Sequence, residues 1–533
     1  MYTLPYDLID TAVHTWQFCR NTDGDCCSGS PYLRPMRQLK SLVTQTAIYG
    51  MSTILVRVLN YLLAPLHTRV FTDQADYGII SEMYAYVTFI NVICMFGMET
   101  AFFRFAAKSE GHPIARVFGS AQVFLFFTTA VITGALLFNA SDIASGLGYA
   151  GKSSYVMYFA LIIAFDTLVN IPFARLRLEG RPWRYFFIKL TNIGINILCN
   201  AFFLLPALLK KPDMFSAIGF TYQPEHGIAY VFIANVIASA VTFCLFLPSM
   251  VRLTFDRQIF TQMLRYGAPL IIIGLAGMIN ETLDRVLIKY WGSGSVTENL
   301  KQVGIYSAVY KLAIFMTLAV QGFRMGAEPF FFSQSTDKNA PSLYAIIMKY
   351  FVIVCCIIFL GVGLFPDIFK IIIGEEYHSG LGIVPVLLLA QLFLGIYYNQ
   401  SVWYKLTDKT TFATLIPISG AVITLGLNYL LIPAYGYAGA AWATCACYFG
   451  MVVMSYYIGQ HHYHVPYPMR KILSYLVMAI VLCLVGLQIA NSLTNFWMSF
   501  SVRIVLLFLF IGFAWWLDIG KLWSSRSKPV ARS

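Results

Sequence analysis

Long apolar stretches alternate with short polar connections along almost the whole chain. The hydrocarbon core of a bilayer is about 30 Å thick, so a helix needs about 20 apolar residues to cross it. The pattern therefore predicts an all-α polytopic membrane protein with about fourteen transmembrane helices. The predicted spans are 42–68, 77–102, 115–138, 154–174, 183–208, 228–249, 264–290, 303–331, 344–365, 381–404, 411–432, 437–458, 471–490 and 499–518.

The composition agrees with a chain embedded in lipid. Of the 533 residues, 58% are hydrophobic and only 12% are charged, and the mean hydropathy is +0.67. The net charge of +12 could indicate a nucleic-acid partner, but the cations concentrate in alternate connections, such as Arg175, Arg177, Arg181 and Arg184. This positive-inside pattern predicts that both termini are cytoplasmic and that nucleic acid is not a partner. The cation-poor ends of the spans form the predicted outer end.

The two ends of the chain differ from its body. Residues 1–35 are polar and rich in turn-forming residues, which predicts a disordered tail or a segment upstream of a natural start at Met36. A short basic lead-in, 36–40, then opens the first span. At the other end, residues 466–533 are predicted to form two additional transmembrane helices and a basic tail.

An internal repeat predicts two lobes. A shift of 226 positions relates the second span to the eighth, and a slightly smaller shift relates Arg69 to Arg285. The matched pairs are Gly78/Gly304, Ile79/Ile305, Ser81/Ser307, Tyr84/Tyr310, Phe89/Phe315, Ala101/Ala327 and Phe105/Phe331. Six spans separate the copies, so they share one orientation about an axis along the membrane normal. We predict two pseudo-symmetric six-helix lobes, 36–255 and 256–465, which face a central cavity as in transporters that work by alternating access.

Two segments carry a family resemblance. The segment 36–105 has a basic start followed by Tyr49-Gly50, Pro65, Arg69, Asp76-Tyr77-Gly78, Gly97 and Arg104. The segment 433–441 is similar to the family pattern "yGxxGAA" at the start of the twelfth helix. Over residues 36–520 the chain resembles a polysaccharide-type flippase of the multidrug/oligosaccharidyl-lipid/polysaccharide exporter superfamily.

The resemblance implies a transporter and not an enzyme. It implies that a polyprenyl-diphosphate-linked oligosaccharide moves from the cytoplasmic to the outer leaflet of a bacterial inner membrane, for O-antigen, capsule or exopolysaccharide assembly. The expected partners are this lipid-linked oligosaccharide and membrane lipids, with a proton or sodium gradient as the driving force. We expect a monomer.

Such a substrate carries an anionic diphosphate, so cations inside the spans are the candidate binding residues. Arg57 lies about 17 residues beyond Lys40, near mid-membrane, and its guanidinium could donate two parallel hydrogen bonds to a phosphate. An ion pair with an acid on another helix is the alternative. Lys311 could hold a phosphate as a point charge, or it could extend its amine to the outer interface.

Four further charges are candidates. Arg69 and Arg285, at the outer ends of the first and seventh spans, could act as gate or exit charges. Interfacial anchoring would also explain Arg69, and an intrahelical pair with Glu281 would explain Arg285. Asp166 and Glu82 could titrate and couple transport to an ion gradient, or they could neutralise Arg57.

A proton- or sodium-coupled cation or drug antiporter on the same scaffold is the alternative function. It should present a carboxylate in the N-terminal cavity, where the first span offers Arg57, although Asp166 keeps this alternative open. A membrane enzyme would need a longer polar loop than the chain has. The sequence has no Gly-rich phosphate loop, and a cluster at His461, His462 and His464 has no nearby carboxylate, so neither a cofactor nor a metal is expected.

Overall fold

The computed structural model describes residues 50–51, 53–107, 113–251, 253–333, 337, 339–407, 409–493 and 495–519. Thirteen helical segments among these residues are long and apolar enough to cross a membrane, and they coincide with thirteen of the predicted spans. Of the first predicted span, the described part is helical at 50–51 and 53–61 and continues as α3. The tail 1–35, Met36 and the basic tail after residue 519 lie outside the described residues.

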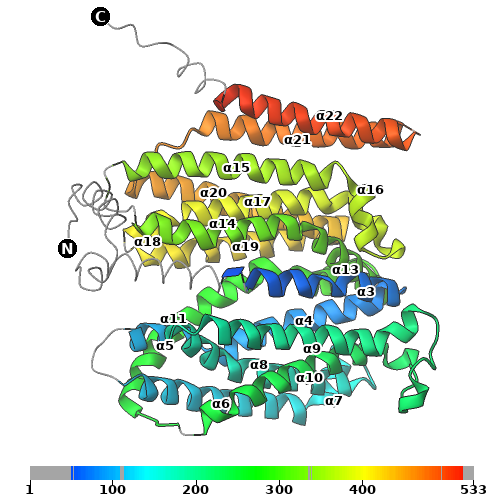
Figure 1. The fold of residues 1–533 in the computed structure, drawn as a ribbon, viewed down its shortest axis with the longest axis vertical. Helices are drawn as coiled ribbons and strands as arrows, with labels where there is room; N and C mark the ends of the chain where they lie inside the picture. Colours follow the sequence, from blue (N-terminus) through cyan, green and yellow to red (C-terminus); the bar gives the residue numbers. More distant parts are fainter. Residues whose placement is uncertain are drawn as a thin grey trace, which may run out of the picture.

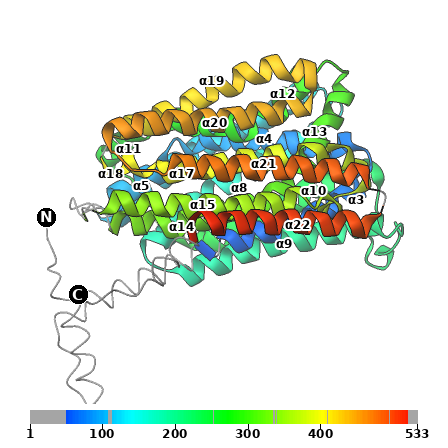
Figure 2. The same cartoon turned by 90° about the horizontal axis from the view of Figure 1, so that it is seen from above.

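The helices form two groups that are stacked side by side, with all the long helices running in roughly the same direction (Figures 1 and 2). The N-terminal group comprises α3 (Leu63–Val70), α4 (Gln74–Met95), α5 (Met98–Ala107), α6 (Ile114–Phe138), α7 (Ala140–Gly146), α8 (Ser153–Leu178), α9 (Pro182–Leu208) and α10 (Gly227–Met250), with the 3-10 turns η2 (Ser216–Ile218) and η3 (Pro224–His226).

The C-terminal group follows the same plan. It comprises α11 (Arg257–Thr282), α12 (Asp284–Trp291), α13 (Val296–Tyr310), η4 (Lys311–Ala313), α14 (Ile314–Ser333), α15 (Ala340–Gly363), α16 (Pro366–Phe369), η5 (Lys370–Ile372), η6 (Glu375–Ile383), α17 (Val384–Gln400), α18 (Val402–Leu406), α19 (Thr410–Tyr435) and α20 (Tyr437–His462). Two further helices, α21 (Met469–Ser492) and α22 (Phe496–Ala514), run alongside α15 at the edge of the molecule (Figure 1), and the π-helical turn η7 (Trp515–Ile519) follows α22.

Polar residues at the helix starts explain several of the boundaries. Asp73 caps α4 by accepting a hydrogen bond from the amide of Ala75, and Asp256 caps α11 in the same way. Ser295 and Glu298 form a capping box at the start of α13. Each cap satisfies backbone donors that have no partner within the helix. These caps fix where spans begin, so the apolar stretches between them keep their register.

The two groups meet where α4 crosses α13. A Cβ atom at Gly78 would lie 2.0 Å from the carbonyl oxygen of Leu300, and one at Gly304 would lie 2.0 Å from that of Gln74. The contact is therefore between backbones, as at small-residue crossings of membrane helices. The sequence repeat relates Gly78 to Gly304, so equivalent positions of the two repeats contact each other at this crossing.

The seventh predicted span, 264–290, is divided in the structure. It forms α11 and α12, with a turn at Leu283. Asp284 opens α12 and is fully buried. Its carboxylate accepts hydrogen bonds from Tyr306 at 2.8 Å, Thr444 at 2.7 Å and Asn428 at 3.2 Å. These bonds hold α12 against its own group, and both parts of the divided span also contact the other group, α11 at α4, α5 and α6 and α12 at α4.

A candidate binding cavity between the helix groups

A cavity of about 430 Å³ lies between the two groups. Its volume falls within the range of small-molecule sites, about 300–1,000 Å³. Residues of the helix before α3, and of α3, α4, α9 and α10, line one part of it, and residues of α12, α13 and η4 line the rest. Both groups must therefore hold their positions for the cavity to keep its shape.

Three cations line the cavity: Arg57, Arg285 and Lys311. They lie near Tyr61, since the Lys311 amine is 5.1 Å from the centre of its ring and both arginines interact with it electrostatically, as does the carboxylate of Glu281. Arg285 lies 4.9 Å from the ring centre of Tyr310 and donates a hydrogen bond across the turn at Leu283, to the carbonyl oxygen of Glu281 on α11. The contact with Glu281 is therefore with its backbone and joins α12 to α11.

The cavity lining contains no carboxylate among the described residues. None of the ion pairs in the described part of the chain includes Arg57, Arg285 or Lys311. A cation at membrane depth is costly unless it is paired or faces water or a ligand. The cavity thus offers three positive charges to an anion.

Asparagines line the other part of the cavity. Every fourth position along one stretch of α9 is an asparagine, namely Asn192, Asn196 and Asn200. Residues at this spacing share one face of a helix. Asn235 of α10 also belongs to the cavity lining. The sequence analysis missed this row, although amides repeated at i, i+4 and i+8 in an otherwise apolar helix were a readable signal.

The other predicted site residues lie outside this cavity. Arg69, at the predicted outer end, donates a hydrogen bond to the carbonyl oxygen of Ile371 at 2.8 Å. Nearby, the Gly374 amide donates to the Thr68 hydroxyl at 3.0 Å. Asp166 lies half-buried on α8, near Ser239 and Lys189. The structure thus brings together Arg57, Arg285 and Lys311 and leaves Arg69 and Asp166 apart from them.

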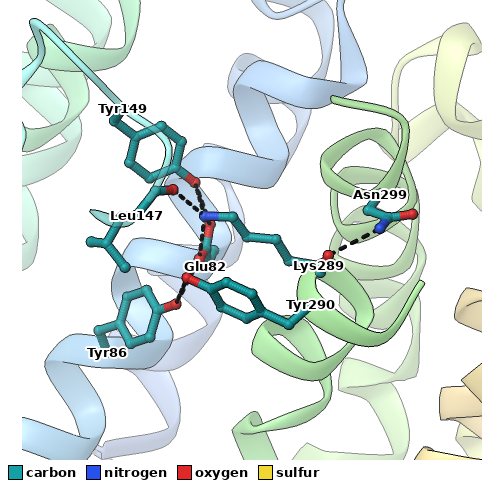
Figure 3. Close-up of polar contacts among 7 residues, drawn as sticks. All are labelled: Glu82, Tyr86, Leu147, Tyr149, Lys289, Tyr290 and Asn299. Atoms are coloured by element: carbon teal, nitrogen blue, oxygen red, sulfur yellow. Dashed lines mark hydrogen bonds and ion pairs between the residues drawn. The ribbon is translucent and has the colours of Figure 1, made fainter. Parts of the chain in front are cut away.

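Glu82 is fully buried at the predicted outer end and forms an ion pair with Lys289 of the other group (Figure 3). The Lys289 amine lies 2.8 and 3.0 Å from the two carboxylate oxygens, and it also donates to the carbonyl oxygen of Leu147 at 2.6 Å. Tyr86 donates to the carboxylate at 2.7 Å, and Tyr149 does so as well. This network joins α4, α12 and the connection between α7 and α8.

The sequence analysis did not identify Lys289 or Asp284 as important residues. Lys289 stands at the end of a span, where a cation usually indicates only an interface. Its partner Glu82 lies 207 positions away, so no local spacing could reveal the pair. Glu82 pairs with Lys289, and Asp166 lies near Lys189, so neither carboxylate is placed against Arg57 in this structure.

Thirteen long apolar helices in two groups around a polar, cationic cavity indicate a multi-pass membrane protein. Residues 68–324 match the family described as "Polysaccharide biosynthesis protein". No curated protein matches the chain.

Solved structures share the fold. The lipid II flippase MurJ, in an inward closed conformation, has a TM-score of 0.66 at 15% identity, over 89% of this chain and 100% of that one. An inward-facing multidrug resistance transporter of the MATE family has a TM-score of 0.56 at 14% identity, over 79% and 97%. A transporter from Pyrococcus furiosus, described as having a binding pocket of reverse polarity, has a TM-score of 0.53 at 13% identity, over 78% and 95%.

These findings confirm the predicted resemblance. The match of residues 68–324 to a polysaccharide biosynthesis family agrees with the resemblance that the sequence analysis named from its motifs, and the solved structures of MurJ and of a MATE transporter share the fold. The all-α fold with its many transmembrane helices is also confirmed.

Proposed function

We propose that this protein moves a polyprenyl-diphosphate-linked oligosaccharide from the cytoplasmic to the outer leaflet of a bacterial inner membrane. The observation that carries the proposal is the set of three cations without carboxylate partners in a cavity between the helix groups. A diphosphate cannot cross hydrocarbon unaided, and charge-assisted hydrogen bonds from arginine and lysine are among the strongest contacts for it. The polyprenyl tail remains in the bilayer beside the protein.

Arg57, Arg285 and Lys311 take the role of diphosphate ligands. Arg57 and Arg285 supply planar forks that can each bind two oxygens, and Lys311 supplies a point charge. Arg69 acts outside the cavity, where its bond to Ile371 fastens the predicted outer end of α3 to the connection after α16. It is a gate charge in this proposal and not a substrate ligand.

The transport cycle is alternating access, in which the two helix groups separate at one end and then at the other. The pair Glu82–Lys289 and the crossing of Gly78 with Gly304 hold the predicted outer end closed. Protonation of Glu82 would remove the charge that attracts Lys289, so Glu82 is the candidate for coupling to a proton gradient. Asp166, beside Lys189, is the second candidate.

The antiporter of organic cations gains no support from this cavity. The three cations that line the cavity would repel a positively charged drug, and no carboxylate among the described lining residues would offset this repulsion. The polarity of the cavity therefore favours an anionic substrate.

Deletion of the gene in its native host tests the proposal. We expect the lipid-linked oligosaccharide to accumulate in the inner leaflet, with loss of the surface polysaccharide and restoration by the wild-type gene. Unchanged surface polysaccharide together with altered efflux of cationic dyes would overturn the proposal and favour the antiporter.

A further inference from the structure

We propose that the asparagine wall, which consists of Asn192, Asn196, Asn200 and Asn235, is the subsite that selects the first sugar of the substrate. The inference rests on the proposed function and deepens it. The N-terminal group supplies this wall, whereas the C-terminal group supplies two of the three cations. One cavity thus has a neutral hydrogen-bonding wall and a cationic wall.

Hydrogen bonds to neighbouring side chains hold the asparagine wall in place. Asn192 donates to the Thr242 hydroxyl at 2.9 Å, and Asn235 donates to the Tyr84 hydroxyl at 2.9 Å. The buried Asn200 donates to the side-chain oxygen of Asn196 at 2.7 Å. Because these partners fix the amide planes, a ligand would not have to order them, which favours selective binding.

Some polar atoms of the cavity remain without a partner. The amide oxygen of Asn192 and the amide nitrogen of Asn196 accept or donate no hydrogen bond within the described residues, and both side chains are half-buried. Across the lining, the Ser307 hydroxyl is buried, only 2% of the residue is exposed, and it too has no partner there. Buried polar groups are normally satisfied, so the open Ser307 hydroxyl indicates a polar ligand. The two half-buried asparagines have further donor and acceptor atoms available to the same ligand.

The chemistry of the substrate indicates which part of it each wall binds: the cations bind the diphosphate, and the asparagine wall binds the first sugar. In a glycosyl diphosphate the first sugar is bonded directly to a phosphate oxygen, so the sugar must lie beside the bound diphosphate. Amides both donate to and accept from hydroxyl and acetamido groups, and a neutral wall does not compete for the phosphates. A site built to hydrogen-bond a hydroxyl discriminates strongly against analogues that lack it. Asn192 and Asn196 are therefore the specificity-determining residues.

Binding to the purified full-length protein in detergent tests this assignment. The probes are undecaprenyl diphosphate and the same lipid carrying one galactose or one N-acetylglucosamine. The wild type should bind at least one sugar-bearing lipid more tightly than the bare lipid. Asn196→Ala should reduce that advantage by about threefold to tenfold, the range for one neutral hydrogen bond, and leave the affinity for the bare lipid unchanged. Asn192→Ala is the second variant, with the same expectation.

The control is Asn170→Ala, which removes a half-buried amide on α8 outside the cavity lining. Equal thermal unfolding of the variants verifies folding. Lys311→Ala should weaken all three lipids, and failure of that result would count against the proposed function itself. If Lys311→Ala weakens every probe while both asparagine variants keep the wild-type preference, the subsite assignment alone is wrong. A wild type that gains nothing from either sugar also overturns it.

Discussion

Lys289 and Lys311 present the same chemistry in two different surroundings. Lys289 is buried against Glu82, with the carbonyl oxygen of Leu147 and two tyrosines around it. Lys311 lines a cavity, and its amine lies 5.1 Å from the centre of the Tyr61 ring. Lys289 is neutralised within the protein, whereas none of the ion pairs in the described part of the chain includes Lys311.

The difference separates a cation that an internal carboxylate neutralises from a cation that remains available to a bound anion. A buried pair that loses one partner is strongly destabilised, because the remaining charge is left without compensation. An unpaired cation that faces a cavity contributes little to the fold and keeps its attraction for an incoming anion. The comparison therefore predicts that changes at Lys289 affect stability, and changes at Lys311 affect substrate binding.

The largest expected effect is at the buried pair. Lys289→Met should lower the free energy of unfolding by about 3–5 kcal/mol, because Glu82 remains buried without a cation. Thermal unfolding of the purified protein measures this. The matched control is Lys301→Met, whose pair with Asp73 at 3.7 Å is exposed and should contribute at most about 1 kcal/mol.

A double variant sharpens this result. Glu82→Gln combined with Lys289→Met should recover much of the lost stability, because no unpaired charge is then buried. If the double variant is as unstable as Lys289→Met alone, the ion pair is not the cause of the loss.

The next effect is at the cavity. Lys311→Ala and Arg57→Ala should each weaken substrate binding by about tenfold to a hundredfold, the range for a hydrogen bond to a charged group. Glycan export in a complemented deletion strain should fall accordingly, while protein abundance in the membrane stays normal. Lys152→Ala, which removes an exposed cation at the predicted outer end, is the control. Retained export in both cavity variants would contradict the claim that unpaired cations in the cavity bind the substrate.

A smaller effect is expected at the helix crossing. Gly78→Ala would place a methyl group 2.0 Å from the Leu300 carbonyl oxygen, and overpacking of this kind costs about 1–3 kcal/mol. It should also favour conformations in which the predicted outer end is open, measured as faster labelling of a cysteine at position 81. Gly134→Ala is the control, because a Cβ atom there meets nothing within 4 Å.

The smallest effect concerns a second paired cation. Arg503 is buried on α22 and donates to Asp367 at 2.9 Å. Partial burial alone would raise the pKa of the Asp367 carboxyl, but hydrogen bonds from Arg503 and Lys370 outweigh it and leave this pKa below its ordinary value. Stability from this pair is therefore present above the ordinary pKa and is lost as the pH falls through the folded one. Asp367→Asn should remove this dependence from an acid unfolding curve.

Sequence reasoning predicted the transmembrane helices well, because lipid forces long apolar helices and leaves a direct record in the pattern. It also selected Arg57 and Lys311 by their depth in apolar spans. It could not tell which cations were paired. The partner of Lys289 lies on a helix of the other group, and the burial of Asp284 depends on contacts with three other helices.

The division at Leu283 had a signal in the sequence, because the polar stretch 280–285 interrupts the apolar pattern of the seventh predicted span. The bonds that anchor Asp284 after the turn come from distant helices and could not be predicted. The asparagine row on α9 was readable in principle, but a search that weighs only charged residues passes over neutral amides.

The most direct test of the central claim is the affinity of the purified protein for undecaprenyl diphosphate, compared between the wild type and the double variant Arg57→Ala/Lys311→Ala. We expect the double variant to unfold at the wild-type temperature and to bind the lipid at least about a hundredfold more weakly, because two charge-assisted contacts are lost. Equal affinity in the two proteins would contradict the claim that the unpaired cations of the cavity hold the diphosphate.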